Sequence, residues 1–268
     1  MRRRAGRQET AKTEWSPARL LVLAGSCVAV LLAIVAGLVL AVIAALAEDP
    51  DGGEASPVAG RATRSLSEQD ALAAAPMPTA EPEEALPGPL SSRAAEVLVL
   101  PRPSGVGPAN VASGFPRTPE GALAQLAAID VTAMQSGSMD GVRDVIGAWA
   151  AAGGPTPENW SGVVGMASLL SGAGLSVAGS PQLAIVVRPV MGLIKGTVGP
   201  DFAVVCVDLE FTVTLERTAR MAVADCQRMV WVEDRWLIGP GPEPAPAPSF
   251  WPGTDAAIDA GWRDLRHA

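Results

Sequence analysis

Hydrophobic residues follow three different patterns along this chain. Residues 20–47 form an uncharged run of 28 residues. Between residues 115 and 172 the apolar positions recur three and four apart, as in helices with one buried face. Between residues 183 and 238 apolar and polar positions alternate, as in half-buried strands. Helices followed by strands predict an α+β domain over residues 115–240, with three helices packed on a curved antiparallel sheet.

The uncharged run fits a single transmembrane helix, because about 20 apolar residues suffice to cross the hydrocarbon core. Basic residues precede the run and acidic residues (Glu48, Asp49, Asp51, Glu54) follow it. Lys and Arg stay on the cytoplasmic side of a span. We therefore expect residues 1–19 to be a basic cytoplasmic stub, residues 20–47 to cross the cell membrane once, and the C-terminal domain to be extracytoplasmic.

A cleaved signal peptide is the alternative, since Ala45-Leu46-Ala47 fits a cleavage pattern. A signal h-region has about 7–15 apolar residues, however, and this run is far longer, which favours an uncleaved anchor.

Small residues recur at every fourth position of the run and would form one ridge on a helix. Such a ridge predicts a helix–helix association face. An Ala-rich span also produces such a stripe without any association, so both interpretations stay open. The residues of the candidate transmembrane association face are Gly25, Ala29, Ala33, Gly37, Ala41 and Ala45.

The predicted domain has clear start and stop signals. Thr118 is a good N-cap, with Pro119 and Glu120 opening the first helix. We expect a second helix from Met139 to Ala152 and a third that starts at Thr156-Pro157-Glu158. The expected strands are Leu183–Val190, Phe202–Leu215, Met221–Val232 and, after a turn at Glu233-Asp234, Arg235–Ile238. Trp231 and Trp236 would then be cross-strand neighbours.

The segments flanking the domain differ in composition. Residues 48–114 are rich in Pro, Ala and Glu and predict an extended tether, with a short strand at residues 97–100 as the exception. Residues 241–268 read as a Pro-rich arm and a short C-terminal helix. That helix has Thr254 as its N-cap and Ile258, Trp262 and Leu265 on one face. Because so short a helix is unstable alone, we expect it to dock on its own domain rather than on a partner.

Cys206 and Cys226 are equidistant from Glu216, which lies in the expected hairpin turn. A turn centred there places the two cysteines opposite each other. The same register pairs Leu209 with Val223 and Phe211 with Met221 on the apolar face. Outside the membrane a disulfide could persist. The alternatives are this candidate disulfide and two free, packed thiols.

The sequence offers little chemistry for catalysis. The net charge is −8, there is no Tyr, and the single His, His267, is second from the end. We expect no enzymatic activity, no cofactor and no metal, and the acidity argues against nucleic-acid binding by the exported domain. Asp208 and Glu210 could form a carboxylate pair, but we favour a solvated or interface-facing strand surface for both.

The order of stub, span, tether and helices-then-sheet domain resembles the bitopic core components of bacterial conjugation and type IV secretion machines, the TcpC-like conjugal transfer proteins in particular. The segments that carry the resemblance are residues 117–123 (RTPEGAL) and residues 226–231 (CQRMVW). It implies a nuclear-transport-factor-like domain, in which a curved sheet wraps a helix to form a cone. This chain has one such domain where longer family members have two.

The resemblance implies a non-enzymatic scaffold that assembles a DNA-transfer channel. Its partners would be membrane lipid, other subunits of a membrane assembly and further copies of itself. One alternative is an accessory membrane protein of a transport or cell-envelope system. The other, less favoured, is a small-molecule-binding cone, which would require a pocket with an inward carboxylate.

Overall fold

The structure is a computed structural model that describes residues 68–268, all within a unit that begins at Ser56. The predicted span at residues 20–47, its small-residue ridge and the cytoplasmic stub lie outside the described residues. Within residues 68–268, no helix is both long and apolar enough to cross a membrane.

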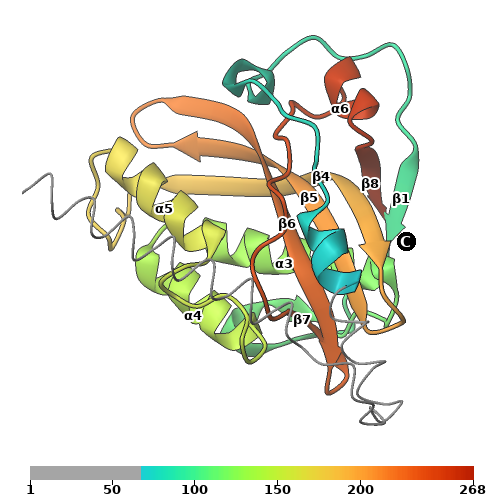
Figure 1. Ribbon diagram of the computed structural model, residues 1–268. Coiled ribbons are helices and arrows are strands. Elements are labelled where there is room, and N and C mark those ends of the chain that lie inside the picture. The colour runs from blue at the N-terminus through green and yellow to red at the C-terminus, as the bar shows by residue number, and fades with distance from the viewer. Residues whose placement is uncertain (1–67) are drawn as a thin grey trace, which may run out of the picture. The chain divides into compact units, whose positions relative to one another are not determined.

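A curled six-stranded sheet, close to a half-barrel, forms the centre of this unit (Figure 1). Its strand order is β1-β8-β4-β5-β6-β7, and every neighbouring pair is antiparallel except β1 and β8. The strands are β1 (Val97–Leu100), β4 (Ala184–Thr197), β5 (Phe202–Thr214), β6 (Thr218–Val232), β7 (Arg235–Ile238) and β8 (Arg263–His267). A separate two-stranded ribbon pairs β2 (Gly105–Val106) with β3 (Ala112–Ser113).

Three helices pack against one face of the sheet, which we call the helix face (Figure 1). They are α3 (Pro119–Gln135), α4 (Met139–Trp149) and α5 (Ser161–Gly172). Shorter elements are a helical turn over residues 68–74, the 3₁₀ turns η1 (Pro82–Ala85) and η2 (Pro108–Asn110), and α6 (Asp255–Asp259). Helices first and an antiparallel-rich sheet after them confirm the predicted α+β class.

The three predicted helices form, with shifted ends. Thr118 caps α3 as expected, its Oγ1 accepting a hydrogen bond from Gly121 N at 3.1 Å. The second helix ends at Trp149, because Ala150 turns to an extended conformation and bridges to β7. The third begins at Ser161 rather than at Thr156, since residues 156–159 close a separate turn held by the Asn159 side chain.

The hairpin register agrees with the prediction. Strand β5 pairs with β6 as Cys206 with Cys226, Leu209 with Val223 and Phe211 with Met221. The tight turn before β7 places Glu233 and Asp234 at φ values of 47° and 69°. Trp231 and Trp236 are cross-strand neighbours, with ring centroids 5.4 Å apart.

The opposite face of the sheet, which we call the strap face, is covered by two chain segments that flank the domain in sequence. These straps are residues 68–95 and residues 239–262. They hydrogen-bond to each other: Ala245 N donates to Ala73 O at 3.0 Å and Ser91 N to Gly253 O at 2.8 Å. A second apolar cluster lies between the straps and the sheet. The strands contribute Met191, Cys206 and Cys226 to it, and the second strap contributes Phe250, Ala257 and Trp262.

The expectation of an extended tether over residues 48–114 therefore does not hold for residues 68–114. Ala73, Leu98, Leu100 and Val111 are buried in the core. The apolar positions of this segment are too sparse for a periodic signal, but the sheet supplies the surface that buries them. The predicted strand at residues 97–100 is confirmed as β1.

The C-terminal segment docks on its own domain as expected, but its helix is shorter than predicted. Thr254 caps α6, accepting a hydrogen bond from Ala257 N at 3.3 Å. Gly261, at a φ of +89°, reverses the chain, and residues 263–267 form β8 between β1 and β4. A helical face reaching Leu265 is therefore wrong, because pairing with two strands satisfies more backbone groups than one further helical turn.

Candidate functional site

The helix face contains a polar cluster in an otherwise apolar interior. Asp225 and Gln227 lie on β6 at positions whose side chains point to the helices, in line with Met229. Asp130 of α3 and Ser161, the first residue of α5, meet them there. Sequence analysis missed this cluster, although Asp225 and Gln227 interrupt the apolar positions Met221, Val223 and Met229 of that strand.

Hydrogen bonds link four of the polar groups. Gln227 Nε2 donates to Asp225 Oδ1 at 3.1 Å and to Ser161 Oγ at 3.4 Å. Ser161 N donates to Oε1 of Glu243, an exposed residue of the Pro-rich arm, at 2.8 Å. Asp130 Oδ2, Asp225 Oδ2 and Trp160 Nε1 are buried without a partner. The site thus retains unused hydrogen-bonding capacity.

Burial dominates the electrostatics of this cluster. It raises the pKa of Asp130, which is 3% exposed, well above its usual range, and the nearby Asp225 and Glu243 charges raise it further. Burial also raises the pKa of Asp225 to about 7, although the Gln227 hydrogen bond opposes this shift. Because two close carboxylates resist ionising together, the pair retains a proton near neutral pH. A protonated carboxyl can donate a hydrogen bond in an apolar setting.

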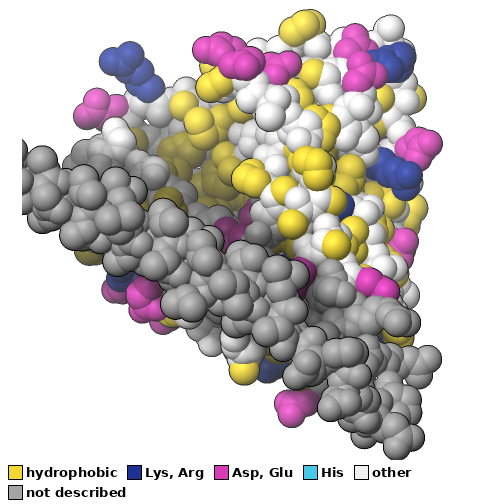
Figure 2. Space-filling view, viewed as in Figure 1, with side chains coloured by type: hydrophobic (Ala, Val, Ile, Leu, Met, Phe, Trp, Pro, Cys, Tyr) yellow, Lys and Arg dark blue, Asp and Glu magenta, His cyan; other side chains and the backbone are white. Residues whose placement is uncertain are grey.

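An apolar hollow lies beside the end of the β5–β6 hairpin on the surface shown in Figure 2. At this end of the sheet the exposed large apolar side chains on the helix side are Val164 of α5 and Met221 and Val223 of β6, and Val186 of β4 is exposed on the strap face. Val223 is two residues from Asp225 on the same face of β6. Across residues 68–268, no group of His, Cys, Asp or Glu is arranged to hold a metal ion.

Asp208 and Glu210, the carboxylate pair considered from sequence, lie on the strap face in different environments. Asp208 is 0% exposed, neither of its oxygens has a hydrogen-bond partner, and burial raises its pKa to about 8. Glu210 instead accepts a hydrogen bond from Arg220 Nη2 at 2.5 Å. The expectation of a solvated or interface-facing strand surface is therefore wrong for Asp208, because the straps cover the middle of β5 and bury this side chain inside its own domain.

Cys206 and Cys226 are joined by a disulfide across β5 and β6, with Cα atoms 4.0 Å apart. Both cysteines are buried beneath the straps. Of the two states left open from sequence, the structure has the bridge.

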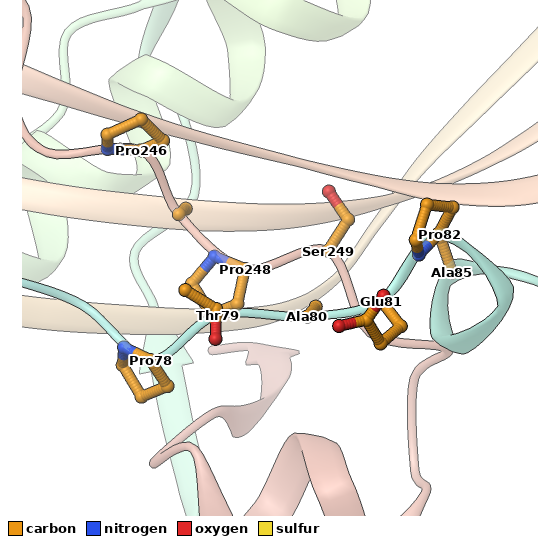
Figure 3. A pocket seen from close by; sticks show the side chains of 10 residues that line it. Pro78, Thr79, Ala80, Glu81, Pro82, Ala85, Pro246, Pro248 and Ser249 are labelled. Carbon is orange, nitrogen blue, oxygen red and sulfur yellow. The ribbon is translucent and has the colours of Figure 1, made fainter.

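The two straps enclose a cleft of about 320 Å³ (Figure 3). Pro78, Thr79 and Glu81 line it from the first strap, and Pro246, Pro248 and Ser249 from the second. Ser249 Oγ is already bonded to Ala224 N at 2.9 Å. Glu81 is the only ionisable residue of the lining, so the cleft has few polar groups that could bind a ligand or act in catalysis.

Comparisons of the chain with protein-family models, with curated proteins and with solved structures find no match.

Proposed function

We propose that this protein is a membrane-anchored, non-enzymatic scaffold whose extracytoplasmic domain helps to assemble a conjugative DNA-transfer channel of the type IV secretion kind. The observation that carries the interaction function is the open edge of the sheet at β1. There Val97 and Val99 expose apolar side chains on a strand that pairs on one side only among the described residues. Such an edge is a ready template for a partner chain.

Two further observations support the setting. The uncharged run at residues 20–47 and its basic flank are those of an anchor with a cytoplasmic N-terminus. The Cys206–Cys226 bond suits an oxidising compartment, since disulfides are rare in the cytosol.

The curled sheet around α3 is compatible with the nuclear-transport-factor-like cone that the family resemblance implies. In this proposal α3 fills the cone and the straps close its outer surface. An accessory protein of a transport or envelope system would share this layout, so partner identity decides between the two.

The test is affinity purification of the full chain from cross-linked, detergent-solubilised membranes. We expect the ATPase and channel subunits of a conjugation system to co-purify. The matched control is a chain whose residues 20–47 are replaced by an unrelated span, which retains the exported domain. Transporter subunits in place of channel subunits would favour the accessory alternative, and recovery in the soluble cytosolic fraction would refute the anchored setting.

A second candidate, a small-molecule-binding cone, is favoured by one observation: Asp130 and Asp225 each have a buried carboxyl oxygen without a hydrogen-bond partner, at the face of β6 that also exposes Met221 and Val223. Such a site would suit an apolar ligand with one hydrogen-bonding group. The test is titration of the purified protein with the apolar dye Nile red. If the hollow binds ligands, Met221→Asp weakens the saturable fluorescence signal, whereas Val186→Asp, at a position on the strap face that is 49% exposed against 41% for Met221, leaves it unchanged. Absence of saturable binding would remove this candidate.

A further inference from the structure

The two terminal strands of the sheet differ in how far other parts of the chain pair with their outer sides. At the β7 edge, Ala150 bridges to Ile238 and Ala151 N donates to Ile238 O at 2.8 Å, so residues 150–151 cover the end of that strand. At the β1 edge, right-hand in Figure 1, none of residues 68–268 pairs with the outer side of Val97–Leu100. Of the two terminal strands of the sheet, β1 is therefore the one left without a partner along its whole outer side; inside the sheet, residues 184–190 of β4 also lie beyond its pairing with β8.

The backbone groups available on β1 follow from its pairing with β8. Glu96 O accepts from Asp264 N at 2.8 Å, and Leu100 O accepts from Ala268 N at 3.0 Å. Because residues alternate in direction along a parallel ladder, Val97 and Val99 turn their N–H and C=O groups away from β8. These groups have no hydrogen-bond partner elsewhere in residues 68–268.

Apart from its short length of four residues and the Pro101 that ends it, β1 has none of the usual protections against pairing. Val97 is 42% exposed and Val99 is 53% exposed, and β1 itself contains no charged residue. Native sheets normally blunt a free edge with a Lys, a bulge or a covering segment. Pro101 ends the strand but does not interrupt it. A cleft of about 460 Å³ adjoins the strand, lined by Val97, Val99, Pro101 and Pro116 among others.

The sequence of this edge is complementary to itself. In an antiparallel pair of β1 strands with Val99 opposite Val99, Glu96 of each copy lies opposite Arg102 of the other. Both residues are exposed, and each already has a partner in its own chain: Glu96 Oε2 lies 3.2 Å from Arg263 Nε, and Arg102 Nε donates to the Ala268 carbonyl, so the intermolecular pairs must share or replace these contacts. Leu98 then faces Leu100, extending the buried face of the sheet. A shift of the register by two residues removes both charge pairs, so charge selects this alignment.

The same alignment satisfies the free N–H groups of Val97 and Val99 and the C=O group of Val99, and leaves the Val97 C=O without a donor because it lies opposite Pro101. Val99 exchanges two hydrogen bonds with its counterpart, and Val97 N–H donates to the Pro101 carbonyl in both directions. Pro101 has no N–H to leave unpaired at that position. The pairing therefore forms four backbone hydrogen bonds and leaves no buried donor without an acceptor.

We propose that two copies of this chain pair through β1 in this antiparallel register, joining their sheets into one. The pairing rests on the proposed function for its setting, and it specifies how the homo-oligomer of that assembly forms.

The test is disulfide trapping of the full chain in its membrane, with Cys27 replaced by Ala. Val99→Cys is expected to give a covalent dimer under mild oxidation, because the two Val99 residues meet at the two-fold axis. Val106→Cys, which is more exposed but lies off this edge, is the control for random collision. Equal trapping at both positions would overturn the pairing.

Charge exchange tests the register separately. Glu96→Arg and Arg102→Glu should each reduce Val99→Cys trapping at least fivefold, and the double exchange should restore it. A double exchange that fails to restore trapping would overturn the register. Loss of trapping with channel subunits still co-purifying refutes the pairing alone, whereas trapping without any channel subunit refutes the proposed function alone.

Discussion

The helix face and the strap face of the same sheet are built on different principles. Helices α3, α4 and α5 cover the helix face from one continuous stretch of chain, with apolar side chains at helical spacing. Two segments about 150 residues apart, with almost no regular structure, cover the strap face. A helix carries its own backbone hydrogen bonds, whereas each strap obtains them from the other strap or from the sheet.

This difference explains what each face contains. The strap face depends on large aromatic side chains and on the Cys206–Cys226 bond, since its covering segments add little local stability of their own. Buried carboxyls occur on both faces: Asp130 and Asp225 on the helix face, and Asp208, with no hydrogen-bond partner on either oxygen, on the strap face. We place the candidate ligand site on the helix face because two carboxyls meet there, one of them on the strand that also carries the exposed side chains of Met221 and Val223.

We expect the largest effect on stability from removing one buried Trp from each face of the sheet. Trp262→Ala on the strap face and Trp149→Ala on the helix face should each lower the free energy of unfolding by about 3–5 kcal/mol, because both side chains are fully buried. Urea denaturation followed by fluorescence measures this. Val177→Ala, at an exposed position, is the control. A cost below about 1 kcal/mol for Trp262→Ala would mean that the straps are a passive cover.

Loss of the disulfide should be the next largest effect. Replacing both Cys206 and Cys226 by Ala should lower the free energy of unfolding by about 3 kcal/mol, since the bond closes a loop of 20 residues in the unfolded chain. Denaturation with and without reductant checks the cause. Reductant should destabilise the natural protein and leave the double variant unchanged; an equal response in both would contradict the assignment.

Asp208 should make the strap face sensitive to pH. Its pKa is about 8 in the folded protein and about 4 in the unfolded chain, so the unfolded state ionises first. Its contribution to stability is therefore highest below pH 4 and declines as pH rises to about 8. Asp208→Asn should raise the free energy of unfolding by roughly 2 kcal/mol at pH 8 and change little at pH 4. Thermal denaturation across this range measures both.

The same pH dependence of stability can be measured on the helix face with Asp225. Its folded pKa is about 7, so the gain from Asp225→Asn should level off about one pH unit earlier than the gain from Asp208→Asn. Identical pH profiles for the two variants would contradict the different environments assigned to the two faces.

We expect the smallest losses of stability from removing the N-caps of α3 and α6. Thr118→Ala should cost about 1 kcal/mol, because its hydroxyl accepts a hydrogen bond at the start of the 17-residue helix α3. Thr254→Ala should cost less, since the bond it makes to α6 is longer, at 3.3 Å. Replacement of each Thr by Ser is the control and should retain most of the stability. Equal losses at both caps would show that the short strap helix depends on its cap as much as α3 does.

Much of the helix face was predictable because its signals are local. The Thr118 cap, the alternation along β5 and the turn at Glu233-Asp234 each act within a few residues, and they led to the correct helices and hairpin register. The third helix start failed, since Thr156 and Asn159 form a turn that competes with the same capping signal. Asp225 and Gln227 were not recognised as a buried cluster, because the sequence of a strand does not show which of its two faces the helices will cover.

The sequence by itself determined the α+β class, the hairpin register that puts Cys206 opposite Cys226 and the apolar run that predicts an anchor, because periodicity, turn chemistry and hydropathy are properties of neighbouring residues. Only the tertiary structure decided that residues 68–95 cover the sheet, that residues 263–267 form a strand, and that Asp130 and Asp208 are buried. Each of these depends on contacts between residues far apart in the chain, whose free energy appears only once the sheet offers a surface to bury them.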